Sequence, residues 1–131
     1  MMPQTPYDST ILLLLLEDDS PISISLEDIL NDEGFTVQPF ASCAQALQWL
    51  KEVRPDGAIL YVSLRGETCL EVARELQGLS VPFVIYSGRH RSEKLLPGFD
   101  HVPWLEKPCS FRDILAALED VMPAAQRRRQ A

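Results

Sequence analysis

Short apolar stretches alternate with amphipathic, helix-length segments along nearly the whole chain. The expected strands are residues 11–16, 35–40, 58–62, 81–88 and 101–108. Helical patterns are expected at about 21–33, 43–53, 67–77 and 111–121. Pro39 restricts the second strand to a sheet edge or to its own end, and Pro97-Gly98 limits any helix within 89–100 to about two turns. Strand-then-helix units of this length predict an α/β fold, with a parallel sheet covered by helices on both faces.

Residues at the ends of these segments predict where the helices begin. Ser20 is expected to cap the first helix with Pro21 at its first position, and Ser42 is expected to cap the second. Ser110 with Asp113 resembles a capping box that opens the last helix. Four apolar side chains of the first helix are expected to share its buried face: Ile22, Leu26, Ile29 and Leu30.

The length and charge of the chain limit the classes of function. At 131 residues it fits one domain, residues 11–122, between a flexible segment at 1–10 and a flexible basic tail at 123–131. A formal net charge of -7 argues against a nucleic-acid-binding protein, whose footprint would be a basic face. The basic cluster Arg127-Arg128-Arg129 lies in the tail, where we expect it to be solvated.

Neither the cysteines nor the longest apolar run indicates export or a membrane. Cys43, Cys69 and Cys109 are odd in number and widely spaced, which predicts reduced thiols and no zinc site. The run from Ile11 to Leu16 is too short to cross a bilayer, and three acidic residues follow it directly. We therefore expect a soluble, cytoplasmic protein.

Side chains suited to phosphoryl chemistry follow the expected strands. In a parallel sheet of this kind, ligands collect outside the carboxyl ends of the strands. The residues there are Glu17, Asp18 and Asp19 after the first strand, Tyr61 and Ser63 at the third, Ser87 at the fourth and Lys107 at the fifth. Carboxylates bind magnesium, while lysine and hydroxyl groups bind phosphate oxygens. Taken singly, each has an ordinary explanation as a helix-terminal acid, a turn serine or a surface lysine.

Four motifs in this order resemble the receiver domain of response regulators, the phosphorelay proteins of two-component signalling. They are "LLLLEDD", "RPDGAILYVSLRGE", "VIYSG" and "EKP". The resemblance covers Ile11 to Val121 and implies a flavodoxin-like, doubly wound five-stranded sheet of order 2-1-3-4-5. By position, it makes Glu17 and Asp18 the magnesium acids, Ser63 a carbonyl ligand, Ser87 the switch hydroxyl, Trp104 the switch aromatic, Lys107 the phosphate-pairing amine and Lys107-Pro108 a cis peptide.

The resemblance fails at the position of the phosphoacceptor aspartate, where this chain has Tyr61. A phenol, with an ordinary pKa of about 10, is neutral at pH 7 and binds hard metals poorly. Its oxygen also lies further from the backbone, which removes in-line geometry. We expect weakened magnesium binding, with Lys107 holding Glu17 and Asp18 instead. Asp56, at the amino end of its strand, and Asp19, at the start of a helix, are poor substitutes.

Three classes of function remain. The leading interpretation is a stand-alone, receiver-like binding module that is unable to undergo normal Asp phosphorylation, is not an enzyme, and signals by protein contact. The alternative is a phosphoacceptor regulator whose aspartate was replaced by Tyr61 through drift, engineering or artefact. A hydrolase or flavin carrier is the least supported class. Expected partners are a histidine kinase, a phosphotransferase or another signalling protein, with a homodimer left open and no nucleic acid or membrane partner.

Overall fold

The computed structural model describes residues 11–61, 70–88, 98–99, 101–107 and 109–122. The predicted flexible ends, 1–10 and 123–131, lie outside these residues, as do Ser63, Cys69 and Pro108. The expectations for them, including the cis peptide at Pro108, therefore stay predictions.

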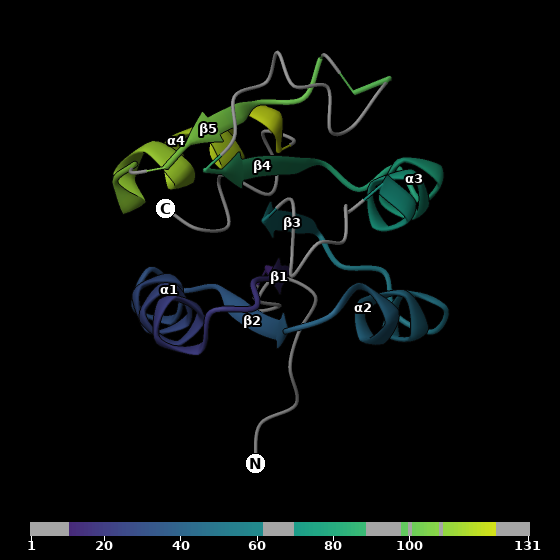
Figure 1. Ribbon diagram of the computed structural model, residues 1–131, viewed down its shortest axis with the longest axis horizontal. Helices are drawn as coiled ribbons and strands as arrows, with labels where there is room; N and C mark the ends of the chain where they lie inside the picture. Colours follow the sequence, from purple (N-terminus) through teal and green to yellow (C-terminus); the bar gives the residue numbers. More distant parts are fainter. Residues whose placement is uncertain (1–10, 62–69, 89–97, 100, 108, 123–131) are drawn as a thin grey trace, which may run out of the picture.

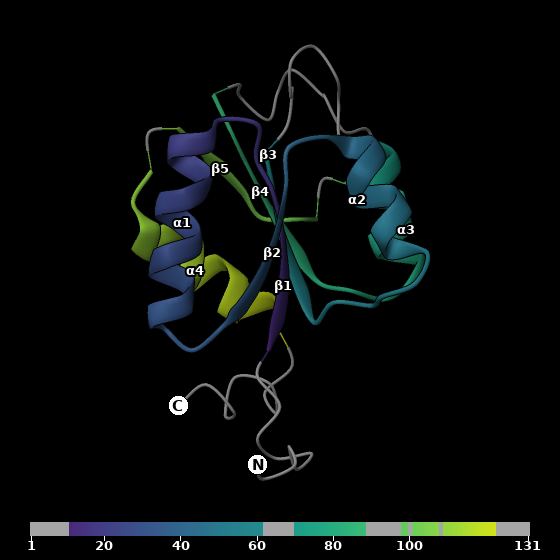
Figure 2. The ribbon, with the colours of Figure 1, turned by 90° about the horizontal axis from the view of Figure 1, so that it is seen from below.

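The described residues form a parallel sheet with helices on both faces (Figure 1). Its strands are β1 (Leu12–Leu16), β2 (Thr36–Phe40), β3 (Gly57–Tyr61), β4 (Phe83–Ser87) and β5 (Trp104–Glu106). Its helices are α1 (Ser20–Asp32), α2 (Cys43–Leu50), α3 (Leu70–Gly78) and α4 (Phe111–Val121). The strand order β2-β1-β3-β4-β5 confirms the predicted topology. Figure 2 shows α1 and α4 on one face of the sheet and α2 and α3 on the other.

Alternating side chains of the central strands build a core on each face of the sheet. Leu14, Leu16 and Leu60 pack on the α2–α3 face. Leu13, Leu15 and Ile59 pack on the α1–α4 face, together with Tyr86 and Leu118 of other elements. Since successive strand residues point to opposite faces, the continuous apolar run in β1 reflects a strand that is buried on both sides.

The helix starts were predicted correctly at two of three places. Ser42 accepts from the Gln45 backbone N–H, and Ser110 forms the expected capping box with Asp113. The assignment of Ser20 is wrong, because Asp19 caps α1 by accepting from the Ile22 backbone N–H at 3.2 Å. A carboxylate there also interacts with the positive end of the helix dipole, and Ser20 becomes the first helical residue.

The buried face of α1 is narrower than predicted. Leu26 and Leu30 are buried, but Ile22 and Ile29 are more than a third exposed. The same helix exposes 58% of Ile24. The helical spacing of apolar residues on α1 therefore includes surface positions as well as core positions.

Other boundaries differ by a few residues. α2 ends at Leu50 and gives way to a turn, three residues before the predicted end at Val53. β2 is an edge strand, as Pro39 predicted. Within the part of the chain that the structure describes, no helix has the length and apolar character needed to cross a membrane.

Candidate functional site

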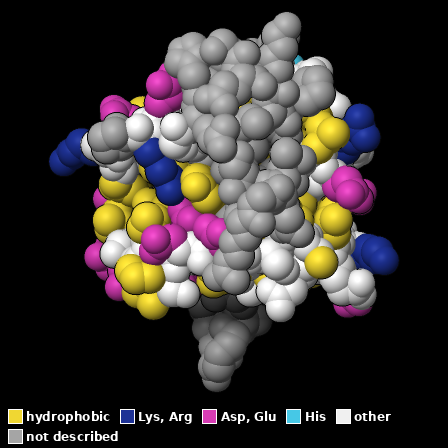
Figure 3. Space-filling view, in the orientation of Figure 1, with side chains coloured by type: hydrophobic (Ala, Val, Ile, Leu, Met, Phe, Trp, Pro, Cys, Tyr) yellow, Lys and Arg dark blue, Asp and Glu magenta, His cyan; other side chains and the backbone are white. Residues whose placement is uncertain are grey.

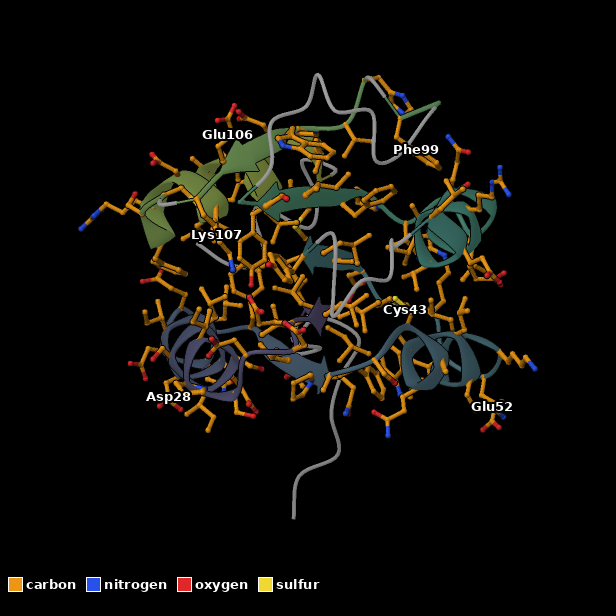
Figure 4. All side chains as sticks on the ribbon, viewed as in Figure 1. Asp28, Cys43, Glu52, Phe99, Glu106 and Lys107 are labelled. Atoms are coloured by element: carbon orange, nitrogen blue, oxygen red, sulfur yellow. The ribbon has the colours of Figure 1, made fainter. Side chains whose placement is uncertain are left out.

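Three side chains form a row across the carboxyl ends of neighbouring strands. They belong to Glu17, Tyr61 and Tyr86. Leu16 of β1 pairs with Leu60 of β3, so the next residues, Glu17 and Tyr61, lie opposite each other. Tyr61 in turn pairs with Tyr86 of β4. Parallel strands in register turn paired residues to the same face, which places all three on the α1–α4 side. Lys107 directly follows β5, and Figure 4 shows it pointing toward the ends of β1 and β3.

Glu17 is a buried carboxylate with both oxygens engaged. Its side chain is buried away from solvent, and Oε1 accepts a hydrogen bond from the Tyr86 hydroxyl. The same oxygen lies 3.4 Å from Lys107 Nζ, while Oε2 accepts from the Asp19 backbone N–H at 3.1 Å. A buried charge of this kind is tolerated because a cation and hydrogen-bond donors surround it.

The Lys107 ammonium lies between Glu17 and two aromatic rings. Nζ is 3.8 Å from the ring centre of Tyr61 and 4.8 Å from that of Tyr86. Both distances fall within the range of cation–π attraction, which is stronger where water is partly excluded. The two rings lie 5.5 Å apart in a tilted arrangement. The ammonium is thus held by groups of the chain itself.

The environment of this cluster keeps Tyr86 protonated. Burial, and then its hydrogen bond and electrostatic contact with Glu17, raise the pKa of Tyr86 well above its ordinary value of 10.0. The hydroxyl therefore acts as a neutral donor to the carboxylate. Burial and the nearby Asp113 charge also raise the pKa of the Cys109 thiol, while Lys107 acts in the opposite direction. A protonated thiol is a poor nucleophile, so Cys109 lacks the setting of a reactive cysteine.

The sequence reasoning missed Tyr86. Its position in the apolar stretch "VPFVIYSG" makes it look like an ordinary core residue of β4. The signal that identifies it is the register with Tyr61, which is available only once the strand pairing is known.

The structure separates the predicted switch residues from the acidic cluster. Trp104 pairs with Ile85 and packs against the core on the α2–α3 face. Ser87 is fully buried and, two positions after Ile85, belongs to that same face by strand alternation. The Ser87 carbonyl accepts from the Lys107 backbone N–H at 2.7 Å, which links the end of β4 to the residue after β5.

The remaining acids differ in how near they lie to this cluster. Asp19 is exposed at the start of α1, and Asp18 is partly buried beside Glu17. Asp56 accepts from the Leu12 backbone N–H at 2.9 Å, at the amino end of the sheet. The Asp19 side chain caps α1, and Asp56 precedes β3 at the opposite end from Tyr61.

Both carboxylate oxygens of Glu17 already have partners at the position where the resemblance implies magnesium. Among the described side chains, no group of three or more His, Cys, Asp and Glu residues is arranged to hold a metal. Glu17, the acid at the centre, already directs one oxygen to Tyr86 and Lys107 and the other to a backbone N–H. A metal at Glu17 would have to displace these partners.

A family model described as the response regulator receiver domain matches residues 13–119. The transcriptional regulatory protein AfsQ1 of Streptomyces coelicolor is 30% identical over 118 residues, which cover 88% of this chain and 52% of that protein. The response regulator MprA of Mycobacterium ulcerans is 26% identical, with 86% and 50% covered. The chain thus spans about half the length of these curated relatives.

Solved structures agree with this match. A response regulator receiver protein from Sinorhizobium medicae superposes with a TM-score of 0.80 at 26% identity, covering 88% of this chain and 97% of that one. The chemotaxis response regulator CheY4 of Vibrio cholerae gives a TM-score of 0.74 at 22% identity, covering 87% and 100%. At that identity the second match shows the fold alone.

Proposed function

Because the chain belongs to the response regulator receiver family, we propose that it is an atypical receiver, unable to undergo normal Asp phosphorylation, that signals through protein–protein contacts. Receiver domains work in two-component systems, where they interact with histidine kinases and phosphotransfer proteins. In this chain, Tyr61 stands at the carboxyl end of β3, where the resemblance calls for the acceptor aspartate.

The observation that carries this proposal is the position of the Lys107 ammonium. It lies 3.4 Å from Glu17 Oε1 and 3.8 Å from the Tyr61 ring centre. The charge of Glu17 is therefore balanced by the chain's own cation and by the Tyr86 hydroxyl. Because the Lys107 ammonium balances the negative charge of Glu17, that carboxylate has little net charge left to attract a divalent ion.

The chemistry of Tyr61 supports the same conclusion. A neutral phenol supplies no carboxylate for an acyl phosphate, and its ring occupies space beside Lys107. We further propose that the chain is not an enzyme and needs no cofactor, with magnesium binding weakened. Two observations support this view. The Lys107 ammonium already pairs with Glu17, and the Asp19 and Asp56 side chains accept from backbone N–H groups of Ile22 and Leu12.

A second candidate is a phosphoacceptor regulator in which Tyr61 has replaced the aspartate. It is favoured by the other family residues at the site, since Glu17, Asp18, Ser87 and Lys107 are all present. Their geometry differs from an open pocket because Lys107 is paired with Glu17.

We also propose a cytoplasmic location and a histidine kinase, phosphotransferase or other signalling protein as the partner. The odd number and wide spacing of the three cysteines support a reducing compartment. A second copy of this chain is a further candidate partner, which would give a homodimer.

Intact mass after incubation with magnesium and a small-molecule phosphodonor tests the proposal. The wild-type chain is expected to gain no phosphoryl group, whereas Tyr61→Asp gains one. Tyr61→Phe serves as the matched control, since it keeps the ring and still lacks a carboxylate. A phosphorylated wild-type chain would contradict the proposal, and fragment mapping would then identify the acceptor.

A further inference from the structure

We propose that the surface formed by α1, β2 and α2 docks an arginine-containing basic segment of a partner protein. We name it the β2 surface. It is made of two hollows that meet at Pro39 and Phe40, one toward α1 and one toward α2. The inference rests on the proposed contact function and adds to it a surface and the chemistry of the partner.

The whole net charge of the chain lies in one segment. Residues 17–52 contain eight acidic side chains and a single basic one, Lys51, which gives a net charge of -7. This equals the net charge of the full chain, because the remaining residues hold eleven acidic and eleven basic side chains. The segment runs from the end of β1 through α1 and β2 to the turn after α2. A partner for this side of the molecule is therefore basic.

The segment forms one side of the molecule. In Figure 1, α1, β2 and α2 make up the lower part, at the edge of the sheet opposite β5. Figure 4 labels Asp28 on α1 and Glu52 in the turn after α2, at the two ends of this part and on the opposite side of the sheet from Glu106. Figure 3 shows acidic and hydrophobic side chains intermixed over α1, at the lower left.

Both hollows contain apolar side chains together with acidic ones. The hollow toward α1 has a volume of about 220 Å³ and includes Ile24 and Glu27. The hollow toward α2 has a volume of about 600 Å³ and includes Trp49 and Glu52. Phe40 and Trp49 contact each other with ring centres 5.5 Å apart, and both remain partly exposed. A basic side chain that stacks on these rings thus has a carboxylate beside it in either hollow.

Arginine suits these hollows better than lysine. Its planar guanidinium stacks on aromatic faces while also donating to carboxylates, whereas an ammonium is a compact and more strongly hydrated charge. Trp49 offers the ring and Glu52, three residues later, offers the carboxylate. The pattern therefore favours a segment with at least one arginine rather than any positively charged surface.

The partner docks through side chains and not by adding a strand to the edge of β2. Thr36 N–H donates to Ile11, and Phe40 C=O accepts from Glu17, so these residues face β1. By alternation, Val37 and Pro39 turn their backbone nitrogens to the free edge, where Pro39 has no N–H to donate. An added strand would lack that hydrogen bond.

A peptide titration tests the proposal. Trp104→Phe leaves Trp49 as the single tryptophan, so its fluorescence reports on the hollow toward α2. Acetylated, amidated hexa-arginine is expected to give a saturable change that salt weakens, with hexa-lysine binding more weakly. In this background Glu52→Gln should lower the affinity about two- to fivefold. Phe40→Leu, which keeps the bulk but not the ring, should lower it by a similar factor.

The control for non-specific charge attraction is Glu75→Gln, which removes one exposed carboxylate from α3. The proposal is overturned if Glu75→Gln weakens binding as much as Glu52→Gln, or if no saturable change occurs. Replacing Arg127, Arg128 and Arg129 together by Gln tests the chain's own tail. Tighter hexa-arginine binding by that variant would make the tail the occupant and overturn the assignment to a partner. Since no phosphodonor or magnesium is used, either outcome leaves the phosphorylation test independent.

Discussion

Replacing Tyr86 by Phe removes one hydroxyl from the centre of the cluster and little else. The ring stays in place against Tyr61 and below Lys107, so packing and cation–π contacts are kept. What is lost is the hydrogen bond to Glu17 Oε1, an oxygen buried away from solvent. The variant therefore measures how much this hydroxyl stabilises the buried carboxylate.

The expected loss is about 2 kcal/mol of unfolding free energy, because a hydrogen bond to a charged group is worth about 1.5–3 kcal/mol. Lys107 compensates little, since its 3.4 Å separation from Glu17 is longer than that of a strong charge-assisted bond. For a domain of this size, that loss lowers the Tm by about 6–10 °C.

Urea denaturation followed by circular dichroism measures the effect at pH 7. The same substitution in a Glu17→Met background, which removes the acceptor and keeps a side chain of similar length, completes a double-mutant cycle, and the coupling between the two sites should be of the order of the single loss. If Tyr86→Phe stays within about 0.5 kcal/mol of wild type, or if the cycle shows no coupling, the buried carboxylate does not depend on Tyr86 and the reasoning fails.

Three further predictions concern stability. Because the pKa of Tyr86 is raised, the folded chain keeps a proton that the unfolded phenol loses, so unfolding free energy should fall by about 1.4 kcal/mol between pH 9 and 11. Urea titrations at both pH values check this, and Tyr86→Phe should lack that component. Asp56→Ala should cost about 1–2 kcal/mol in urea denaturation, since it removes the acceptor of the Leu12 N–H; no change would contradict the role of that bond. Ser110→Ala should cost about 1 kcal/mol by the same measurement through loss of the cap on α4, and an unchanged midpoint would exclude it.

The sheet was predictable from the sequence because its signals are local. The run in β1 reads as a strand buried on both faces, and Pro39 marks an edge, since each follows from a few adjacent residues. The capping box at Ser110 is local in the same sense. The error at Ser20 arose because Asp19 and Ser20 are neighbouring residues of types that both cap helices well. In the structure Asp19 has the extended backbone of a cap, and Ser20 is already helical.

The site was predictable in its residues but not in its arrangement. The order of strand ends brings Glu17, Tyr61 and Lys107 together. The role of Tyr86 depends on register between strands that are far apart in sequence, and the separation of Ser87 from the cluster depends on which face each strand residue takes. Those are properties of pairing, which no single segment of the sequence contains.

The surface isoleucines show a further limit. Helical spacing marks Ile22 and Ile29 as core positions, yet the packing of α1 leaves them more than a third exposed. Periodicity identifies an apolar stripe, and the neighbouring elements determine how much of it is covered. On α1, the uncovered part lies beside the acids of the segment that carries the net charge.

The central claim is that Lys107, and not a bound magnesium ion, balances the charge of Glu17 in a site where Tyr61 replaces the acceptor aspartate. A calorimetric titration with magnesium tests this claim most directly. Wild type and Tyr61→Phe are expected to bind magnesium much more weakly than Tyr61→Asp, which gains a new carboxylate beside Glu17 and Asp18 and binds one ion. Saturable binding of one magnesium ion by the wild-type chain, with an affinity equal to that of Tyr61→Asp, would contradict the claim.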